Sequence, residues 1–241
     1  MGSEMRLVFA SNNAHKLAEV RAIMPAGVEV LSLRDIGFQA EIDETGSTLE
    51  ENSLIKADVV SQWLKANSQC PKVDGVFADD TGLEIDALNG EPGVYTARWY
   101  SRSHPSDTPN DDVVTIGPRA LRSPQKLKFS GAPVSEMEIF AANRAKALRE
   151  LAGKENRGAQ FRTVITLIKP TQALPEGKEI IQVEGVVRGR IATEEYGEGG
   201  FGYDPLFIPE GYDKTFGELP AEIKNNISHR ARALEELVKI L

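Results

Sequence analysis

The sequence predicts an α/β protein, and three observations support this class. Short apolar runs typical of buried strands alternate with segments whose apolar residues recur at helical spacing. Two runs late in the chain, 161–168 and 179–187, look like adjacent strands joined by a loop. The chain has 241 residues, long enough for one large α/β domain or two lobes, and no internal repeat or clear linker divides it.

Composition excludes several classes of protein. The chain carries 36 acidic and 28 basic residues, so its formal net charge is -8. This balance argues against non-specific binding to nucleic acid or to an anionic membrane, but leaves room for a small basic pocket that binds a compact anion. The single cysteine, Cys70, excludes an intrachain disulfide framework. No transmembrane run or signal-peptide pattern is present, so we expect a cytoplasmic protein.

The first segment reads as strand, polar turn and helix. Residues 7–10 form the expected strand, residues 11–13 the turn, and residues 14–24 the helix, which Pro25 ends. This order presents free backbone N–H groups and a positive dipole end above the turn. Lys16 opposes the dipole there, which favours a place beside a bound anion over a solvated lysine. The P-loop pattern is absent.

A second strand, 28–31, precedes an acidic loop at 41–46. Thr48 with Glu51 forms a capping-box pattern for a helix that runs to about Asn67. On pattern alone, Lys56 on this helix is more typical of surface charge than of chemistry.

Residues 77–88, FADDTGLEIDAL, hold two adjacent carboxylates, Asp79 and Asp80. We expect a strand before them, a turn at Thr81 and Gly82, and a second strand-like run at 83–88. Because successive strand side chains point to opposite faces, one carboxylate can face a cleft and the other the opposite side. Such a carboxylate can hold a hard cation or accept a proton from water. The alternative is a simple polar turn.

The middle of the chain differs from the rest in residue composition. Residues 90–95 read as a rigid turn. Residues 101–134 are rich in Ser, Pro, Asp and Gly, and we interpret them as an insertion or flap rather than a domain. A helix is then expected from a cap at Ser135 through Leu151.

The last third contains a glycine-rich run, 197–205, with an aromatic pair, which suggests a planar ligand or else an elaborate loop before a strand at 206–208. Ser228 is a good N-cap for a helix that runs to Leu241. His229 and Arg230 lie in its first turn, a poor design for a helix, which favours an anion or a base carbonyl as their partner.

Together these motifs resemble the inosine triphosphate pyrophosphatase family, the house-cleaning XTP/dITP diphosphatases. The likeness covers nearly the whole chain in family order and is specific in combination. The matching runs are SNNAHK (11–16), ETGSTLEENSLIKA (44–57), FADDTGLEIDAL (77–88), GEPGVYTARW (90–99), GGFGYDPLF (199–207) and KNNISHRARAL (224–234).

The resemblance implies an elongated mixed β-sheet with flanking helices, with two lobes around a central cleft, as a single domain over residues 1–241 and usually a homodimer. It implies Mg²⁺-dependent hydrolysis of ITP, dITP and XTP between the α- and β-phosphates, which gives a nucleoside monophosphate and pyrophosphate. A small-molecule nucleotide is then the partner, with neither nucleic acid nor membrane involved.

The resemblance also assigns residues. Asp80 and Lys16 would be catalytic, Asp80 as metal ligand and general base, with Asp43 or Glu44 as a further metal ligand. The phosphate-binding turn would comprise Ser11, Asn12, Asn13, Ala14, His15 and Lys16, with Lys56 as another basic contact and Thr81 touching substrate. The residues expected to enclose and read the purine are Phe201, Gly202, Tyr203, Asp204, Lys224, His229 and Arg230.

Physical chemistry fits this assignment. Mg²⁺ favours carboxylates, phosphate oxygens and water, and phosphoryl-type transfer depends on positioning and charge neutralisation. A 6-oxo purine offers an acceptor where adenine offers an amino donor, so donors from His229 or Arg230 would discriminate against adenine. Two departures from the family, Asn12 for Gly and Asp43 for Glu, look tolerable.

Three alternatives remain. The septum-formation-inhibitor-like pyrophosphatases have a similar fold, but their phosphate turn reads Ser-x-Ser-Pro-Arg-Arg, unlike residues 11–16 here. A non-catalytic nucleotide sensor is disfavoured by intact Lys16, Glu44, Asp79 and Asp80. A nucleic-acid-binding module is disfavoured by the acidic balance.

Overall fold

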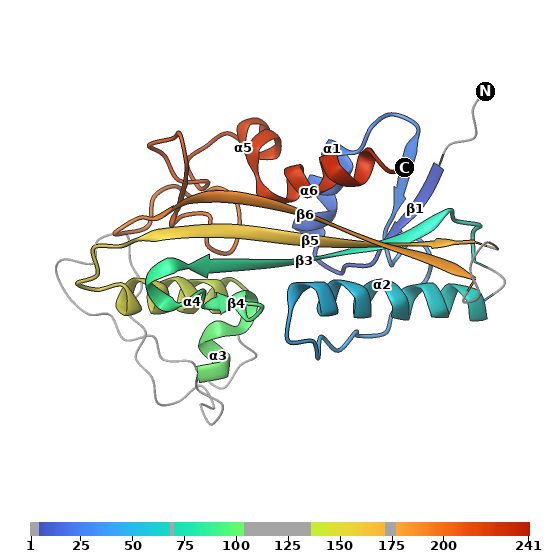
Figure 1. Cartoon of the computed structure of the whole chain (residues 1–241), viewed down its shortest axis with the longest axis horizontal. Coiled ribbons are helices and arrows are strands. Elements are labelled where there is room, and N and C mark those ends of the chain that lie inside the picture. The colour runs from blue at the N-terminus through green and yellow to red at the C-terminus, as the bar shows by residue number, and fades with distance from the viewer. Residues whose placement is uncertain (1–4, 68–69, 104–135, 172–176) are drawn as a thin grey trace. The chain divides into compact units, whose positions relative to one another are not determined.

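A computed structural model of the chain describes residues 5–67, 70–103, 136–171 and 177–241 (Figure 1). Most of the expected flap, 101–134, and the expected cap Ser135 lie outside the described residues. The chain forms two compact units. Unit 1 contains residues 1–81, 162–186 and 225–241, and unit 2 contains residues 82–161 and 187–224.

Strands and helices alternate from β1 to β3, and later in the chain several strands or helices follow one another directly. The strands are β1 (Met5–Phe9), β2 (Val28–Leu31), β3 (Gly75–Ile85), β4 (Pro92–Gly93), β5 (Gly158–Pro170), β6 (Lys178–Ile191) and β7 (Phe207–Pro209). The α-helices are α1 (Ala14–Ile23), α2 (Leu49–Ala66), α3 (Trp99–Ser103), α4 (Glu136–Glu150), α5 (Ala221–Ile227) and α6 (His229–Val238). Two 3-10 turns, η1 (Asp86–Leu88) and η2 (Thr96–Arg98), follow β3 and β4.

The strands form one mixed sheet in the order β2-β1-β3-β5-β6-β7, with β4 paired to β3. Strand β1 is parallel to both β2 and β3, whereas β3 with β4 and β6 with β7 are antiparallel. Three long strands, β3, β5 and β6, contribute residues to both units. The predicted α/β class with a mixed sheet and flanking helices is therefore confirmed.

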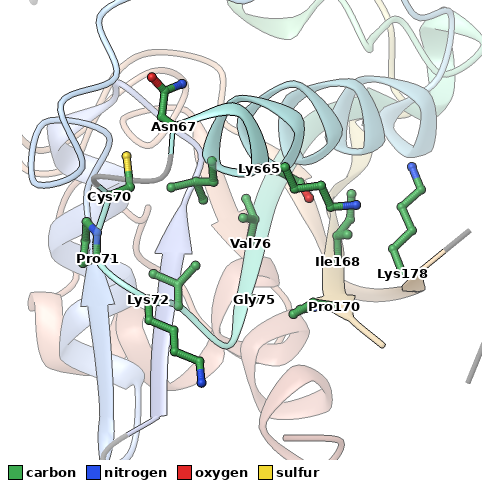
Figure 2. Close-up of a pocket in the computed structure, with 13 residues that line it drawn as sticks. Lys65, Asn67, Cys70, Pro71, Lys72, Gly75, Val76, Ile168, Pro170 and Lys178 are labelled. Carbon is green, nitrogen blue, oxygen red and sulfur yellow. The ribbon is translucent and has the colours of Figure 1, made fainter. Parts of the chain in front are cut away.

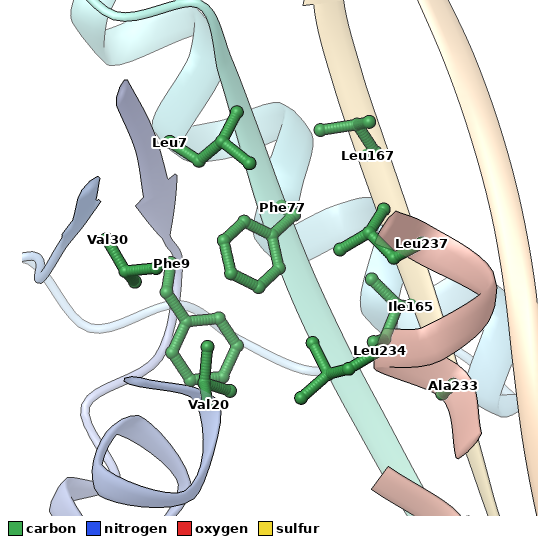
Figure 3. Packing of buried hydrophobic residues seen from close by; sticks show 10 residues of the cluster. All are labelled: Leu7, Phe9, Val20, Val30, Phe77, Ile165, Leu167, Ala233, Leu234 and Leu237. Atoms are coloured by element: carbon green, nitrogen blue, oxygen red, sulfur yellow. The ribbon is translucent and has the colours of Figure 1, made fainter. Parts of the chain in front are cut away.

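In unit 1, helices cover both faces of the sheet (Figure 1). Figure 3 shows the core under α1 and α6, where Phe77 of β3 packs beside Phe9 of β1 and Leu237 of α6. The rings of Phe9 and Phe77 stack with centroids 5.0 Å apart. Val76 and Ala78, the neighbours of Phe77 along β3, face the other way and pack in the cluster that α2 covers. Within unit 1, strand alternation therefore assigns the odd-numbered residues of β3 to the side of α1 and α6, and the even-numbered ones to the side of α2.

Three helices begin at a side-chain cap, and two of these caps, Thr48 and Ser228, are the ones that the sequence predicts. The side chain of Asn13 accepts a hydrogen bond from Lys16 N at 3.0 Å, and that of Thr48 from Glu51 N at 3.1 Å. Ser228 accepts from Ala231 N at 3.1 Å. Each cap satisfies a backbone N–H that the first helical turn leaves without an intrahelical partner.

The expected turn at Thr81 and Gly82 is wrong. Strand β3 continues without interruption from Gly75 to Ile85, and residues 86–88 form the 3-10 turn η1 rather than a strand end. Taken alone, the residues Asp-Asp-Thr-Gly favour a turn, because Asp and Gly are common turn residues. Here both carboxylates are buried and hydrogen-bonded to cationic side chains, so tertiary contacts outweigh that preference.

Helix α2 offers a matched test of the packing. Val60 is 0% exposed and its neighbour Val59 is 39% exposed. We expect Val60→Ala to lower the free energy of unfolding by about 2 kcal/mol, because it removes two buried methyl groups and leaves a cavity. Val59→Ala should change it by less than about 0.5 kcal/mol. Urea denaturation measures both, and equal losses would contradict this packing of α2.

Candidate active site

The turn before α1 holds the first group of predicted residues. Ser11 Oγ accepts a hydrogen bond from Asn13 N at 3.2 Å, and Asn13 caps the helix. Asn12, Ala14 and His15 are exposed around the helix start. No acidic residue lies in the first turn of α1, so the positive end of its dipole is balanced by no carboxylate of that turn. The turn thus joins backbone donors with one ammonium group, that of Lys16.

Asp79 is the centre of this side of the sheet. Its Oδ1 accepts from Lys16 Nζ at 3.0 Å and its Oδ2 from Arg230 Nε at 3.0 Å, so both carboxylate oxygens bind cations. Arg230 also pairs with Glu19 of α1. Burial alone would raise the pKa of Asp79, but the nearby charges of Lys16 and Arg230 outweigh it and hold the pKa well below its ordinary value. Asp79 is therefore ionised and fully occupied by protein partners.

Asp80, the next residue along β3, points to the opposite face, toward α2. Lys56 Nζ donates to Asp80 Oδ1 at 3.0 Å and to Glu44 Oε1 at 2.9 Å, and Asn52 Nδ2 donates to Asp80 Oδ2 at 3.3 Å. Burial raises the pKa of Asp80 above its ordinary value, against the attraction of Lys56. A buried carboxylate with a raised pKa is well suited to accept a proton.

The acidic loop before α2 is docked onto this cluster. Asn52 Oδ1 accepts from Gly46 N at 2.8 Å, and a Cβ at Gly46 would lie 2.6 Å from that oxygen, so only glycine fits there. The contact brings Glu44 to Lys56. Asp43, in contrast, is exposed, and its carboxylate makes no hydrogen bond or ion pair within the part of the chain that the structure describes.

Glu44 and Asp80 are the two carboxylates that share one ammonium group. Among the described residues no three His, Cys, Asp or Glu side chains gather as a metal-binding group. Mg²⁺ does not need three, because it commonly binds one or two carboxylates together with substrate phosphates and waters. The donor set of Glu44 and Asp80 therefore fits this cation, whereas both oxygens of Asp79 already bind cations.

His229 lies at the start of α6 and contacts the sheet. Its Nδ1 is 2.6 Å from Thr163 Oγ1 of β5, and Thr163 Oγ1 is 2.8 Å from Thr81 Oγ1 of β3. Arg230 Nη2 lies 3.5 Å from the same Thr81 oxygen. The predicted residues Thr81, His229 and Arg230 thus meet in unit 1, where the Thr163 hydroxyl joins Thr81 to His229.

Gly185 of β6 fixes how closely α6 approaches the sheet. A Cβ at this position would lie 2.2 Å from the His229 carbonyl oxygen and 2.3 Å from Ala233 N. No side chain can enter that space without moving α6. The glycine therefore sets the position of the helical turn that carries His229 and Arg230.

In unit 2, the glycine-rich run folds around Asp204. Asp204 Oδ2 accepts from Phe201 N and from Lys224 Nζ, both at 2.7 Å. A Cβ at Gly200 would lie 2.1 Å from the same oxygen, and its φ of +75 also requires glycine. Lys224 Nζ lies 4.9 Å from the centroid of the Phe201 ring. Three predicted residues, Phe201, Asp204 and Lys224, are thus brought together.

The two other predicted residues of this run have structural contacts. Tyr203 is buried, and its hydroxyl donates to the Thr96 carbonyl at 3.2 Å. The Gly202 carbonyl accepts from Arg144 Nη1 at 2.9 Å. Of the aromatic pair, Tyr203 therefore belongs to the core of unit 2, and Phe201 is the half-buried ring.

The sequence does not single out three side chains of these clusters, namely Glu19, Asn52 and Thr163. It does single out Asp79, but not the two cationic partners of its carboxylate. Asn52 carries one local signal, its place in the first turns of a helix beside the acidic loop. Thr163 carries none, because a Thr within a β-branched strand is typical of any strand.

A pocket of about 240 Å³ opens in unit 1 away from these clusters (Figure 2). It lies between the C-terminal part of α2, the start of β3 and the end of β5. Val76 and Ile168 give it apolar walls, and Lys65, Lys72 and Lys178 lie around it. None of the predicted site residues lines it.

No helix within the described ranges is long and apolar enough to cross a membrane.

Comparison with known proteins places these clusters in context. The chain matches the model of the Ham1 family over residues 7–116 and 128–240. It is 41% identical to a dITP/XTP pyrophosphatase of Flavobacterium johnsoniae over 98% of both chains. Ham1 proteins of Staphylococcus aureus (TM-score 0.69, 33% identity, 98% and 97% of the two chains) and Coxiella burnetii (TM-score 0.70, 30% identity, 98% of both) have similar structures.

The Asp79 cluster predicts a specific pH dependence of stability. Because the folded-state pKa of Asp79 lies below its ordinary value of 3.8, the ionised carboxylate stabilises the fold above about pH 4, and this contribution is lost as pH falls further. We expect Asp79→Asn to lower the free energy of unfolding by about 3 kcal/mol at pH 7, since it leaves buried charges without their partner. The deficit should shrink below about pH 4.

Urea denaturation from pH 7 to pH 3 measures this difference. Asp58→Asn is the control, because Asp58 pairs with Lys178 at a partly exposed site and should cost about 1 kcal/mol or less. A deficit in Asp79→Asn that equals that of the control at pH 7 would contradict this role of Asp79 in the fold.

Proposed function

The chain belongs to the Ham1 family, and we propose that it hydrolyses non-standard purine nucleoside triphosphates (ITP, dITP and XTP) to a nucleoside monophosphate and pyrophosphate, with Mg²⁺ as cofactor. One observation carries this proposal: two lysines, Lys16 and Lys56, are held at adjacent aspartates of β3 beside a helix N-terminus. Removal of such nucleotides from the pool is the corresponding role. A relative with 41% identity over nearly its whole length is named a dITP/XTP pyrophosphatase.

The triphosphate is proposed to bind at the turn before α1. Its oxygens would accept hydrogen bonds from the backbone N–H groups of Asn12 and Ala14 and from Lys16, where the helix dipole also favours negative charge. The N–H groups of Ser11 and Asn13 already donate to the Phe9 carbonyl and to Ser11 Oγ. Asp79 holds the Lys16 ammonium in place. Burial lowers the pKa of Lys16, and a bound phosphate would restore it by adding negative charge.

Asp80 is proposed as the general base. Its pKa is raised by burial, and its carboxylate lies beside Lys56, which neutralises charge on the substrate as well. Glu44 and Asp80 would hold Mg²⁺, with Asp43 the other candidate ligand; the cation would neutralise phosphate charge and lower the pKa of a bound water. Lys16 and Lys56 then orient the phosphates for attack at the α-phosphorus.

The purine base is proposed to be recognised by hydrogen-bond donors of the protein. A 6-oxo purine presents an acceptor at C6, so a side-chain N–H from His229 fits it and leaves a 6-amino purine mismatched. Arg230 is a second candidate, although three of its nitrogens already donate to Asp79, Glu19 and Thr81. In unit 2, Phe201, Asp204 and Lys224 are the candidates for base contacts, and Phe201 offers the ring face.

We also propose that the enzyme acts as a homodimer in the cytoplasm. The acidic balance of the chain supports a freely diffusing protein rather than one that binds nucleic acid. Sedimentation equilibrium at several concentrations tests the oligomeric state, and a single monomer mass at all concentrations would contradict it.

A product assay tests the reaction. With Mg²⁺ present, ITP, dITP and XTP should release pyrophosphate, whereas ATP should release hardly any. A hydrogen-bond donor that is left without its acceptor can lower kcat/KM for the wrong base by up to about 10⁴-fold. Addition of a chelator should abolish turnover. Release of orthophosphate instead of pyrophosphate would move the cleaved bond and overturn the proposal.

Substitutions separate chemistry from binding. Asp80→Asn should lower kcat by about 10²- to 10⁴-fold, because the amide cannot accept the proton. Lys65→Ala is the matched control for Lys56→Ala, since both lysines lie on α2 but Lys65 lines the separate pocket. Lys56→Ala should lose at least about tenfold in kcat/KM, and Lys65→Ala should be unchanged. Equal activity of both lysine variants would remove Lys56 from the site.

A further inference from the structure

We propose that Thr163 is a positioning residue that holds the neutral imidazole of His229 in the Nε2–H tautomer. The inference rests on the proposed function in one respect, namely that His229 reads the purine. It adds a residue of β5 that selects which ring nitrogen of His229 carries the proton. Thr163 acts through His229.

The geometry forms a chain of four polar groups within unit 1. Arg230 Nη2 lies 3.5 Å from Thr81 Oγ1, Thr81 Oγ1 lies 2.8 Å from Thr163 Oγ1, and Thr163 Oγ1 lies 2.6 Å from His229 Nδ1. Thr163 is 0% exposed and His229 is 5% exposed, so these contacts form out of bulk water. The direction of each hydrogen bond then decides the tautomer.

A proton count fixes that direction. A guanidinium can only donate, so Thr81 Oγ1 accepts from Arg230, and the positive charge turns the Thr81 proton away from itself. Within the described residues, Thr163 Oγ1 is the acceptor available to that proton. The Thr163 hydroxyl then donates its own hydrogen bond to His229 Nδ1. Since Nδ1 is the acceptor, the ring proton of the neutral imidazole resides on Nε2.

The reverse order satisfies fewer groups. If His229 Nδ1 carried the proton, it would donate to Thr163, and Thr163 would donate to Thr81. The Thr81 hydroxyl proton would then have no acceptor among the residues the structure describes, beside a guanidinium that repels it. Buried polar hydrogens without acceptors are costly, so the first order is favoured.

The consequence for specificity follows from the ring chemistry. In the Nε2–H tautomer, the nitrogen that Thr163 does not contact is a donor, which pairs with an acceptor such as the C6 oxygen of hypoxanthine or xanthine. In the other tautomer the same nitrogen would be an acceptor, which pairs with the amino group of adenine instead. Thr163 therefore biases the site toward 6-oxo purines without contact to the substrate.

Thr163→Val tests the inference, because valine keeps the shape of threonine and removes the hydroxyl. We expect the ratio of kcat/KM for ITP to that for ATP to fall about tenfold, the cost of one misdirected hydrogen bond. Thr163→Ser should restore the ratio. The matched control is Thr166→Val on the same strand, whose hydroxyl is also buried but contacts Ser53 Oγ at 2.6 Å on the α2 side. It should lose stability without a change in the ratio.

Nitrogen-15 NMR of the imidazole ring reads the tautomer directly and does not depend on activity. The wild-type protein should show the proton on Nε2 of His229, as should Thr163→Ser and Thr166→Val, whereas Thr163→Val should show a mixture of tautomers. An Nδ1–H tautomer in the wild type, or an unchanged ratio in Thr163→Val, would overturn the role of Thr163. Failure of the wild type to release pyrophosphate from ITP would instead overturn the proposed function.

Discussion

The buried carboxylate of Asp79 is the contact on which the arrangement of unit 1 depends. It binds Lys16, 63 residues away in the sequence, and Arg230, 151 residues away. Two helices from opposite ends of the chain are thereby tied to the same strand by one side chain. Removal of water from an ionised carboxylate is costly, and two cations with good hydrogen-bond geometry offset that cost. The polar cluster persists in the interior because each of its charges has a partner.

The adjacent carboxylate, Asp80, differs from Asp79 because a strand turns successive side chains to opposite faces. Asp79 faces α1 and α6 and has a lowered pKa, whereas Asp80 faces α2 and has a raised pKa. Two identical residues, one peptide bond apart, thus acquire separate roles from their surroundings alone. Divergent pKa values in neighbouring titratable groups are typical of sites that perform acid–base chemistry. Asp79 binds two cationic side chains, and Asp80, which accepts hydrogen bonds from Lys56 and Asn52, is the carboxylate that we propose for the metal and the proton.

Local signals were enough to predict much of the fold. The strand, turn and helix at the N-terminus, the caps at Thr48 and Ser228, and the paired strands β5 and β6 all follow from periodicity and capping chemistry. The uninterrupted strand β3 could not be predicted in this way, because its Asp-Asp-Thr-Gly residues locally favour a turn. Only the hydrogen bonds of the two carboxylates to cations from distant parts of the sequence favour the strand. Sequence motifs also gave Lys16, Lys56, Asp80 and His229 as candidates. They could not give Thr163 or Glu19, whose partners lie far away in the sequence.

We propose that Glu44 and Asp80 share a divalent cation with a triphosphate whose oxygens contact Lys16. Crystals grown with Mn²⁺ and a non-hydrolysable analogue of ITP test it most directly, because the anomalous scattering of Mn²⁺ locates the cation independently of any refined position. We expect one strong anomalous peak beside Asp80 and Glu44, with phosphate oxygens of the analogue in contact with Lys16. A cation bound elsewhere, with the phosphates away from the turn before α1, would contradict it.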